Sequence, residues 1–225
     1  MRACLLALLV WTPGAFAAEQ VSICFNYGCI AEARVSYSDA QLSSVRAMLA
    51  SARSAEEERA VLSRAVGRLY AWAGQQAPVW RDRGGDYADD DANGRMDCID
   101  HAVSTTRLLR MIESRGWLRF HGVMDQVRRT GFLRVTQHFS AAVEEKAKTG
   151  KAGEAVSGSA KHSAGGFVYA DCGDCADVMR METQSPAAEP QPSRRFVVDS
   201  WFFDNGTPAV VMPLEDWMSG GGPDV

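Results

Sequence analysis

At residues 89–101 the chain reads Asp89-Asp90-Asp91-Ala92-Asn93-Gly94-Arg95-Met96-Asp97-Cys98-Ile99-Asp100-His101, and this stretch joins an acidic loop to a predicted helix. Apolar residues recur at helical spacing after it, so we expect the helix to run from Asp97 or Cys98 to Arg115 and to stop at Gly116. A cysteine at a helix N-terminus lies in the positive field of the peptide dipoles, which favours the thiolate. Cys98 is therefore the first candidate nucleophile.

The elements on either side of this helix predict an α+β fold. Before it, residues 21–37 have the pattern of a strand or hairpin, and Ser38 and Ser54 open two helices through capping boxes. After it, strand patterns cover residues 117–129, 132–145, 196–203 and 209–213. We therefore expect N-terminal helices, with the helix of Cys98 packed on an antiparallel sheet.

Two polar residues on these strands complete a possible catalytic set. His138 lies in the run Gln137-His138-Phe139, and Asp199 ends the run Val197-Val198-Asp199. Cys, then His, then Asp is the order of parts in a thiol hydrolase or acyltransferase. A lone strand histidine is more often structural, and other residues compete for the roles of base and orienter: His101, His121, His162 and Asp204, the last in an Asp-Asn-Gly turn context.

The first residues have the pattern of a secretory signal peptide. Arg2 precedes a short apolar run, and Ala15-Phe16-Ala17 has the small-residue pattern of a cleavage site. We expect a single domain at residues 18–225 of a periplasmic or secreted protein, with no transmembrane segment after cleavage. Without Arg2 the chain has 23 basic and 28 acidic residues, a net charge of −5, which argues against nucleic acid as a partner.

Cysteine spacing agrees with export. Cys24 and Cys29 are close in sequence, as are Cys172 and Cys175, and such pairs usually form disulfides in an oxidising compartment. The sequence does not determine the pairing. Cys98 remains as the odd thiol outside the signal peptide, either catalytic or inert and buried.

The same four cysteines could instead bind zinc, although disulfides are the commoner outcome in an exported protein. Cys172-Gly-Asp-Cys175 could also be a redox pair. It lies in a polar stretch at about 146–195, which we interpret as a flexible insertion, and no strand–helix frame for a redox motif surrounds it.

The acidic loop matches the pattern of a calcium-binding loop, with Gly94 at the sharp bend. The predicted ligands, at positions one, three, five, seven, nine and twelve, are Asp89, Asp91, Asn93, the carbonyl of Arg95, Asp97 and Asp100. Calcium would order the residues around the nucleophile. The alternatives are a solvated acidic loop, or acids that stabilise a helix N-terminus.

Three runs carry a resemblance to a known family: Met96-Asp97-Cys98-Ile99-Asp100-His101-Ala102, residues 137–143, and Phe196-Val197-Val198-Asp199-Ser200. Over about residues 75–217 the chain resembles the bacterial transglutaminase-like cysteine proteinases. The resemblance implies a transglutaminase-like, papain-like fold, a catalytic triad of Cys98, His138 and Asp199, calcium dependence and a protein or peptide substrate. The chain departs from the family in Met96, His101 and the long insertion.

The leading interpretation is an exported thiol hydrolase that cleaves peptide or amide bonds through this triad and a thioester. The backbone N–H of Cys98 would be one oxyanion donor, and Gln75 and Gln76 are candidates for a second. A transamidase of the same fold would pass the acyl group to an amine. Two other classes stay open: a catalytically inactive calcium-binding module, and a redox protein that uses the Cys-x-x-Cys pair.

Overall fold

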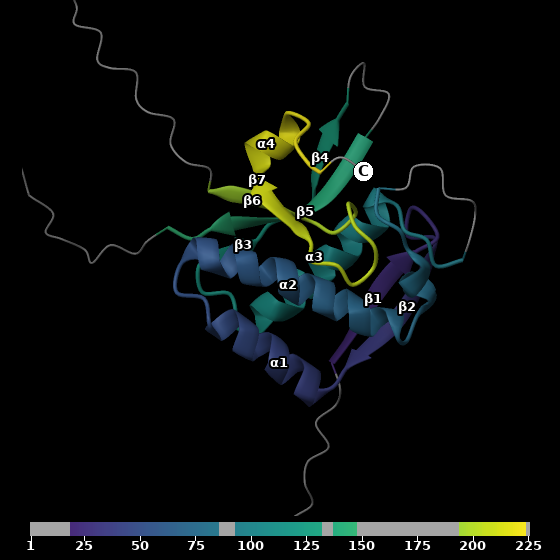
Figure 1. Cartoon of the computed structure of the whole chain (residues 1–225), viewed down its shortest axis with the longest axis horizontal. Coiled ribbons are helices and arrows are strands. Elements are labelled where there is room, and N and C mark those ends of the chain that lie inside the picture. The colour runs from purple at the N-terminus through teal and green to yellow at the C-terminus, as the bar shows by residue number, and fades with distance from the viewer. Residues whose placement is uncertain (1–18, 86–92, 132–136, 148–193, 224–225) are drawn as a thin grey trace, which may run out of the picture. The chain divides into compact units, whose positions relative to one another are not determined.

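The computed structural model describes residues 19–85, 93–131, 137–147 and 194–223 (Figure 1). In this part of the chain four α-helices accompany antiparallel strands, so the predicted α+β class is confirmed. The predicted signal peptide and the predicted insertion fall outside the described residues, apart from the ends of the insertion.

A hairpin and two helices come first, as the sequence predicts. Strands β1 (Glu19–Phe25) and β2 (Ala31–Tyr37) pair antiparallel. Helices α1 (Asp39–Ala50) and α2 (Ala55–Gly74) follow. Ser38 forms a complete capping box with Gln41, and the side chain of Ser54 accepts a hydrogen bond from the backbone N–H of Glu57. These side chains satisfy N–H groups that a helix start leaves without a partner.

The connection to the third helix contains a short 3-10 helix, η1 (Pro78–Arg81), where the sequence predicts only a loop. Gly94 adopts a φ of +103°, which a side chain would disfavour, and an added Cβ would meet the carbonyl of Pro78. Helix α3 (Cys98–Ser114) then begins and ends within one residue of the predicted bounds, and Gly116 has a φ of +68°.

The second half forms a sheet in the order β3-β5-β6-β7, and β4 also pairs with β5. All of its pairings are antiparallel. The strands are β3 (His121–Val123), β4 (Val127–Thr130), β5 (Gln137–Glu145), β6 (Arg195–Asp199) and β7 (Val210–Pro213). A short helix that the sequence analysis did not predict, α4 (Leu214–Met218), follows β7.

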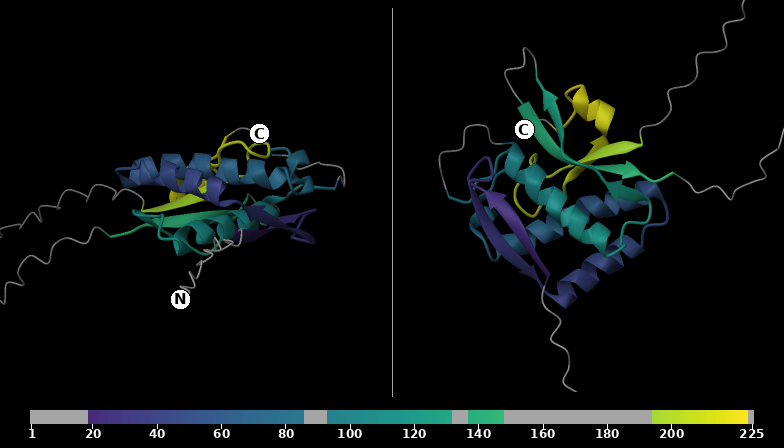
Figure 2. Two further views of the ribbon diagram at one scale, coloured as in Figure 1. Left: turned by 90° about the horizontal axis from the view of Figure 1, so that it is seen from below. Right: turned by 180° about the vertical axis from the view of Figure 1, so that it is seen from behind.

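Helices α1 and α2 form one layer, and α3 and the β1–β2 hairpin lie on the opposite side of the molecule from this layer (Figure 2). The apolar faces of these elements and of β5 and β6 meet in one core. Its fully buried members include Val35, Leu49, Leu62, Leu69, Leu109, Ile112, Val143 and Val198. None of the described helices is long and apolar enough to cross a membrane.

Strand register explains how two distant residues come together. Ala141 of β5 pairs with Val198 of β6. One step along the same antiparallel register sets Ser140 opposite Asp199. Side chains alternate between the faces of a strand, so His138, two residues from Ser140, shares a face with Asp199 and is its diagonal neighbour.

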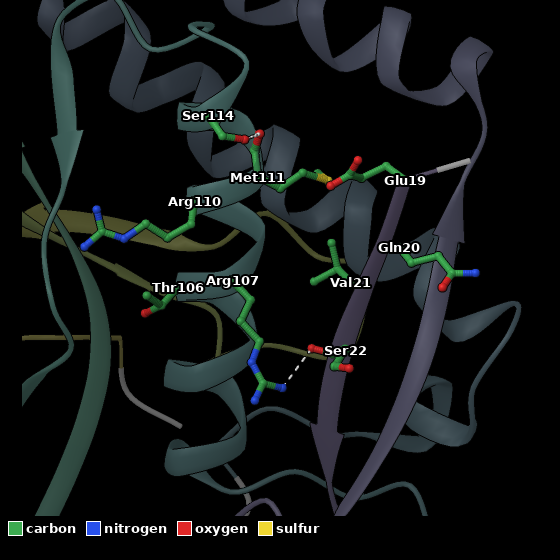
Figure 3. Close-up of a pocket in the computed structure, with 9 residues that line it drawn as sticks. All are labelled: Glu19, Gln20, Val21, Ser22, Thr106, Arg107, Arg110, Met111 and Ser114. Carbon is green, nitrogen blue, oxygen red and sulfur yellow. Dashed lines mark hydrogen bonds between the residues drawn. The ribbon is translucent and has the colours of Figure 1, made fainter. Parts of the chain in front are cut away.

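A groove of about 560 Å³ lies between β1 and the later part of α3 (Figure 3). Its lining residues are Glu19, Gln20, Val21, Ser22, Thr106, Arg107, Arg110, Met111 and Ser114. Thr106 comes eight residues after Cys98, which is roughly 12 Å along a helix. The groove is therefore separate from the N-terminus of α3.

Candidate active site

Cys98 is the first residue of α3, and it is a half-buried free thiol. Asp97 caps the helix, because its Oδ1 accepts hydrogen bonds from the N–H groups of Ile99 at 3.0 Å and Asp100 at 2.9 Å. The Sγ of Cys98 lies 3.9 Å from the carbonyl oxygen of Gln137, the residue before His138. The start of α3 therefore contacts the start of β5, one residue before the predicted base.

The surroundings of Cys98 favour the protonated thiol. Burial raises the pKa of Cys98, and the negative charges of Asp97 and Asp199 raise it further. Hydrogen bonds from the backbone of Phe139 and of Cys98 itself act in the opposite direction without cancelling the rise. The helix N-terminus therefore does not by itself produce the expected thiolate. A thiolate here needs a neighbouring cation.

His138 and Asp199 form a buried hydrogen-bonded pair. The Nε2–H of His138 donates to Oδ2 of Asp199 at 2.8 Å. The indole N–H of Trp217 donates to the same oxygen at 2.9 Å, and the backbone N–H of Trp201 donates to Oδ1 at 3.2 Å. Three donors thus fix the carboxylate, and the carboxylate fixes the imidazole.

Aromatic rings enclose the imidazole of His138. Its centroid lies 4.7 Å from that of Trp201, 5.5 Å from that of Trp217 and 5.7 Å from that of Phe202. Because Nε2 is bonded to Asp199, Nδ1 is the ring nitrogen left for Cys98. The hydrogen bond of the Cys98 thiol runs to the carbonyl oxygen of Gln137 and not to the imidazole. Catalytic hydrogen bonds are often long or misaligned without substrate.

A left-handed turn binds the carboxylates at the start of α3. Residues 26–29 all have positive φ, between 59° and 66°. The N–H groups of Tyr27 and Cys29 donate to Asp100 at 2.8 and 2.6 Å, and the N–H of Gly28 donates to Asp97 at 2.9 Å. Successive N–H groups that converge in this way form a nest for anions. The nest here is filled by the protein's own side chains.

The disulfide between Cys24 and Cys29 closes this turn, so this predicted bond is present. Glu32 lies next to both sulfur atoms, and one ligand atom from each of the three residues lies within 4.8 Å of the others. Since the sulfur atoms are joined to each other, they are not thiolate ligands for zinc. Cys172 and Cys175 lie outside the described residues.

The predicted calcium ligands in the described part of the chain are all hydrogen-bonded to residues 26–29. Besides Asp97 and Asp100, the carbonyl of Arg95 accepts from the N–H of Asn26 at 2.7 Å, and Oδ1 of Asn93 accepts from Nδ2 of Asn26 at 3.1 Å. These oxygens face N–H donors, and Asp100 is completely buried. This arrangement does not fit a cation, and we derive no catalytic step from calcium. Asp89 and Asp91 lie outside the described residues.

We therefore expect that removing calcium with a chelator leaves the melting temperature of the protein unchanged. A ligand that binds only the folded state stabilises it by mass action, so a real calcium site would make the melting temperature depend on calcium. Thermal unfolding in excess calcium and in excess chelator should give the same melting temperature within error. A melting temperature several degrees higher in calcium than in chelator would support the predicted calcium site and contradict the hydrogen-bonded arrangement.

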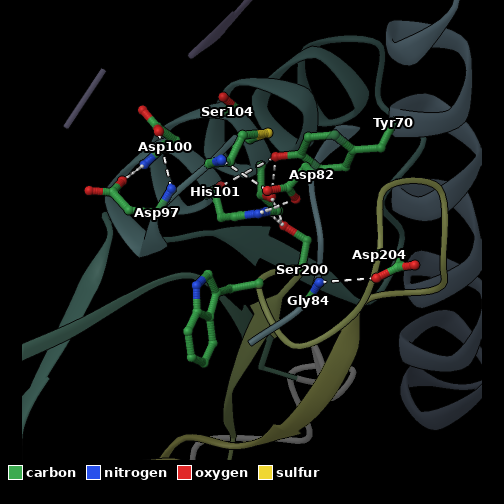
Figure 4. Close-up of polar contacts among 12 residues, drawn as sticks. Tyr70, Asp82, Gly84, Asp97, Asp100, His101, Ser104, Ser200 and Asp204 are labelled. Atoms are coloured by element: carbon green, nitrogen blue, oxygen red, sulfur yellow. Dashed lines mark hydrogen bonds and ion pairs between the residues drawn. The ribbon is translucent and has the colours of Figure 1, made fainter. Parts of the chain in front are cut away.

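His101, a rival of His138 in the sequence, belongs to a different buried pair (Figure 4). Its Nε2 lies 2.9 Å from Oδ2 of Asp82, and its Nδ1 lies 2.8 Å from Oγ of Ser200. Burial alone lowers the pKa of His101, but the charge and hydrogen bond of Asp82 outweigh burial, so the pKa is raised. With both ring nitrogens engaged, His101 is not available as the base for Cys98.

The other rivals also have structural partners. The Nδ1 of buried His121 lies 2.8 Å from Glu58, and the carboxylate of exposed Asp204 accepts from Arg83 at 2.9 Å. Gln76, a candidate oxyanion donor, instead exchanges hydrogen bonds with the backbone of Ser36 at 2.9 Å. Gln75 is the exposed C-cap of α2. His162 lies outside the described residues.

Sequence reasoning missed Asp82, Ser200 and Trp217. Asp82 lies in a segment predicted only as a loop, and nothing in its neighbourhood indicates a partner 19 residues away. Trp217 is on a helix that was not predicted. One signal was available, because Ser200 directly follows Asp199 and ends the run quoted for the family resemblance.

The chain was also compared with protein-family models, with curated proteins and with solved structures, and none of the three comparisons found a match. The resemblance to transglutaminase-like cysteine proteinases therefore stays a prediction.

Proposed function

We propose that the protein is an exported thiol hydrolase that cleaves peptide or amide bonds, with Cys98 as nucleophile, His138 as general base and acid, and Asp199 as orienter. The observation that carries this proposal is the buried His138–Asp199 pair beside a free cysteine at a helix N-terminus. This arrangement, with the thiol on a helix and the base and orienter on a sheet, supports the family resemblance as well.

In the first half of the reaction, Nδ1 of His138 accepts the proton of Cys98 as Sγ attacks the substrate carbonyl carbon. The backbone N–H of Cys98, in the first turn of α3, donates to the resulting oxyanion. Asp199 holds the ring through Nε2 and stabilises the imidazolium. The imidazolium then protonates the leaving amine, the carbon–nitrogen bond breaks, and a thioester remains on Cys98.

In the second half, water enters where the amine has left. His138 removes a proton from the water, and the oxygen attacks the thioester carbon. The carbon–sulfur bond breaks, the carboxylic acid departs, and the thiol regains its proton from His138. A transamidase would differ only here, because an amine would replace water. The substrate would be a protein or peptide met in the periplasm or outside the cell.

A second candidate function has an observation in its favour. The pKa of Cys98 is raised, and its thiol contacts a backbone carbonyl rather than the imidazole. Both features suit a catalytically inactive module that keeps the fold and interacts with a partner. The two candidates differ in whether Cys98 accepts an acyl group.

An activated acetate ester tests this difference. We expect intact-mass analysis to show one acetyl group on the protein, located at Cys98 by peptide mapping, because an activated ester needs only the nucleophile and its base. Cys98→Ala should show none, which serves as the control for other nucleophiles. Decay of the adduct in water indicates a hydrolase, and capture by an added primary amine indicates a transamidase. Failure of Cys98 to acylate would favour the inactive module.

A further inference from the structure

A second set of buried polar residues, separate from the proposed triad, connects three segments of the chain (Figure 4). The hydroxyl of Ser200 lies 2.8 Å from Nδ1 of His101 and 2.9 Å from Oγ1 of Thr105, both on α3. Nε2 of His101 contacts Oδ2 of Asp82, and Oδ1 of Asp82 accepts from the backbone N–H of Met96 at 2.9 Å. The contacts therefore run without interruption from Met96 to Ser200.

The ends of this network coincide with the ends of the triad. Met96 lies two residues before Cys98, and His101 lies three residues after it. Ser200 directly follows Asp199, at the point where β6 ends. The network thus links the segment that carries the nucleophile to the segment that carries the orienter.

Burial makes these links strong and selective. Asp82, His101 and Thr105 are 1%, 3% and 0% exposed, respectively. Hydrogen bonds inside a protein are electrostatically stronger than in water, and a buried polar group that loses its partner is costly. Each member therefore has one favourable arrangement, and the separation of α3 from the end of β6 is fixed accordingly.

We propose that Asp82, His101 and Ser200 are positioning residues that set the distance between Cys98 and the His138–Asp199 pair. This inference rests on the proposed function. Loss of the Ser200 hydroxyl removes two contacts between α3 and the end of β6. Asp199 and the imidazole of His138 then move relative to the thiol of Cys98. Displacements of about 1 Å in such sites can lower the rate on the order of 100-fold.

Breaking a network with a merely structural role would also destabilise the folded protein, so the test needs a matched control. Glu58 and His121 form a second buried carboxylate–histidine pair, with both side chains inaccessible to solvent. His121 pairs in the sheet with Glu145, seven residues along β5 from His138, which is roughly 23 Å. His121→Gln therefore perturbs a comparable pair at a distance from the site.

The experiment measures the second-order rate of Cys98 alkylation by iodoacetamide in the full chain, for Ser200→Ala and His121→Gln. Each of these two substitutions is made once in the native protein, where His138 is present, and once in combination with His138→Ala. With His138 present, we expect Ser200→Ala to lower the rate about tenfold or more. In the His138→Ala background the same change should have less than about a twofold effect, because its route to Cys98 is gone. His121→Gln should lower the melting temperature and leave both rates unchanged.

Thr105→Val keeps the side-chain volume and removes one of the two contacts between Ser200 and α3, so it replaces Ser200→Ala if that variant does not fold. An equal loss of rate in both backgrounds, or the same loss in His121→Gln, would overturn the positioning role. So would an unchanged rate in Ser200→Ala. If His138→Ala alone leaves the alkylation rate unchanged, the proposed function itself fails, and this outcome is separate from the other three.

Discussion

Replacing His138 with alanine is expected to slow alkylation of Cys98 at pH 7 by about 100-fold, and to slow turnover of any substrate by roughly 10²–10⁴-fold. An ordinary cysteine is only a few per cent thiolate at pH 7. Burial and the charges of Asp97 and Asp199 raise the pKa of Cys98 above the ordinary value. Without an imidazolium beside it, the thiol therefore stays almost entirely protonated.

Alkylation kinetics followed by mass spectrometry give this result directly, and His121→Ala is the control for loss of a buried histidine elsewhere. The unfolding temperatures of both variants show that the folds are retained. Equal alkylation rates for the native protein and His138→Ala would mean that the imidazole does not activate the thiol. The site would then be assigned to the inactive module.

Replacing Asp100 with alanine is expected to lower the free energy of unfolding by roughly 3 kcal/mol. The carboxylate is completely buried and accepts hydrogen bonds from the N–H groups of Tyr27, Cys29 and Asp97. Alanine leaves these donors without acceptors. At 2–4 °C per kcal/mol for a chain of this size, the melting temperature should fall by about 6–12 °C.

The pH dependence of this effect has a definite sign. Burial and the neighbouring charge of Asp97 raise the pKa of Asp100 to about 6. The folded state therefore holds a proton between about pH 4 and 6 that the unfolded chain has lost. The corresponding stability is fully present below about pH 4 and is lost as the pH rises through 6. Asp100→Ala should therefore destabilise the protein more at pH 5 than at pH 7.5.

Asp39→Ala is the matched control, because Asp39 is also an acid in the first turn of a helix but is exposed. An exposed acid at that position contributes about 0.3–1 kcal/mol. Chemical denaturation at the two pH values measures both variants. A loss for Asp100→Ala no larger than for Asp39→Ala would show that the nest at residues 26–29 does not hold the start of α3.

Local signals predicted the elements well. The capping residues of α1 and α2, and Gly116 after α3, each act within a few residues of the boundary that they fix. The position of Cys98 at the start of α3 follows from the same local pattern. Alternation along β5 predicted that His138 faces away from Phe139, and strand register then explains its pairing with Asp199.

The sequence did not predict contacts between residues that lie far apart along the chain. The acidic spacing from Asp89 to Asp100 fits a calcium loop, but whether the oxygens of Asp97 and Asp100 meet a cation or N–H donors depends on a turn about 70 residues away. That turn holds Asn26, Tyr27 and Cys29 in a conformation that favours glycine, and no local pattern predicts it. Burial likewise decides the pKa of Cys98, and burial is a property of the packed chain.

The pH dependence of Cys98 alkylation, measured in the native protein and in His138→Ala, tests the central claim most directly. The account predicts that the native protein reacts rapidly at neutral pH, where the imidazole takes the thiol proton. His138→Ala should react appreciably only at alkaline pH, in a single rise above the ordinary thiol range, because nothing then offsets the burial of Cys98. A native profile that shows only this alkaline rise would contradict the account, since Cys98 would then ionise without help from His138.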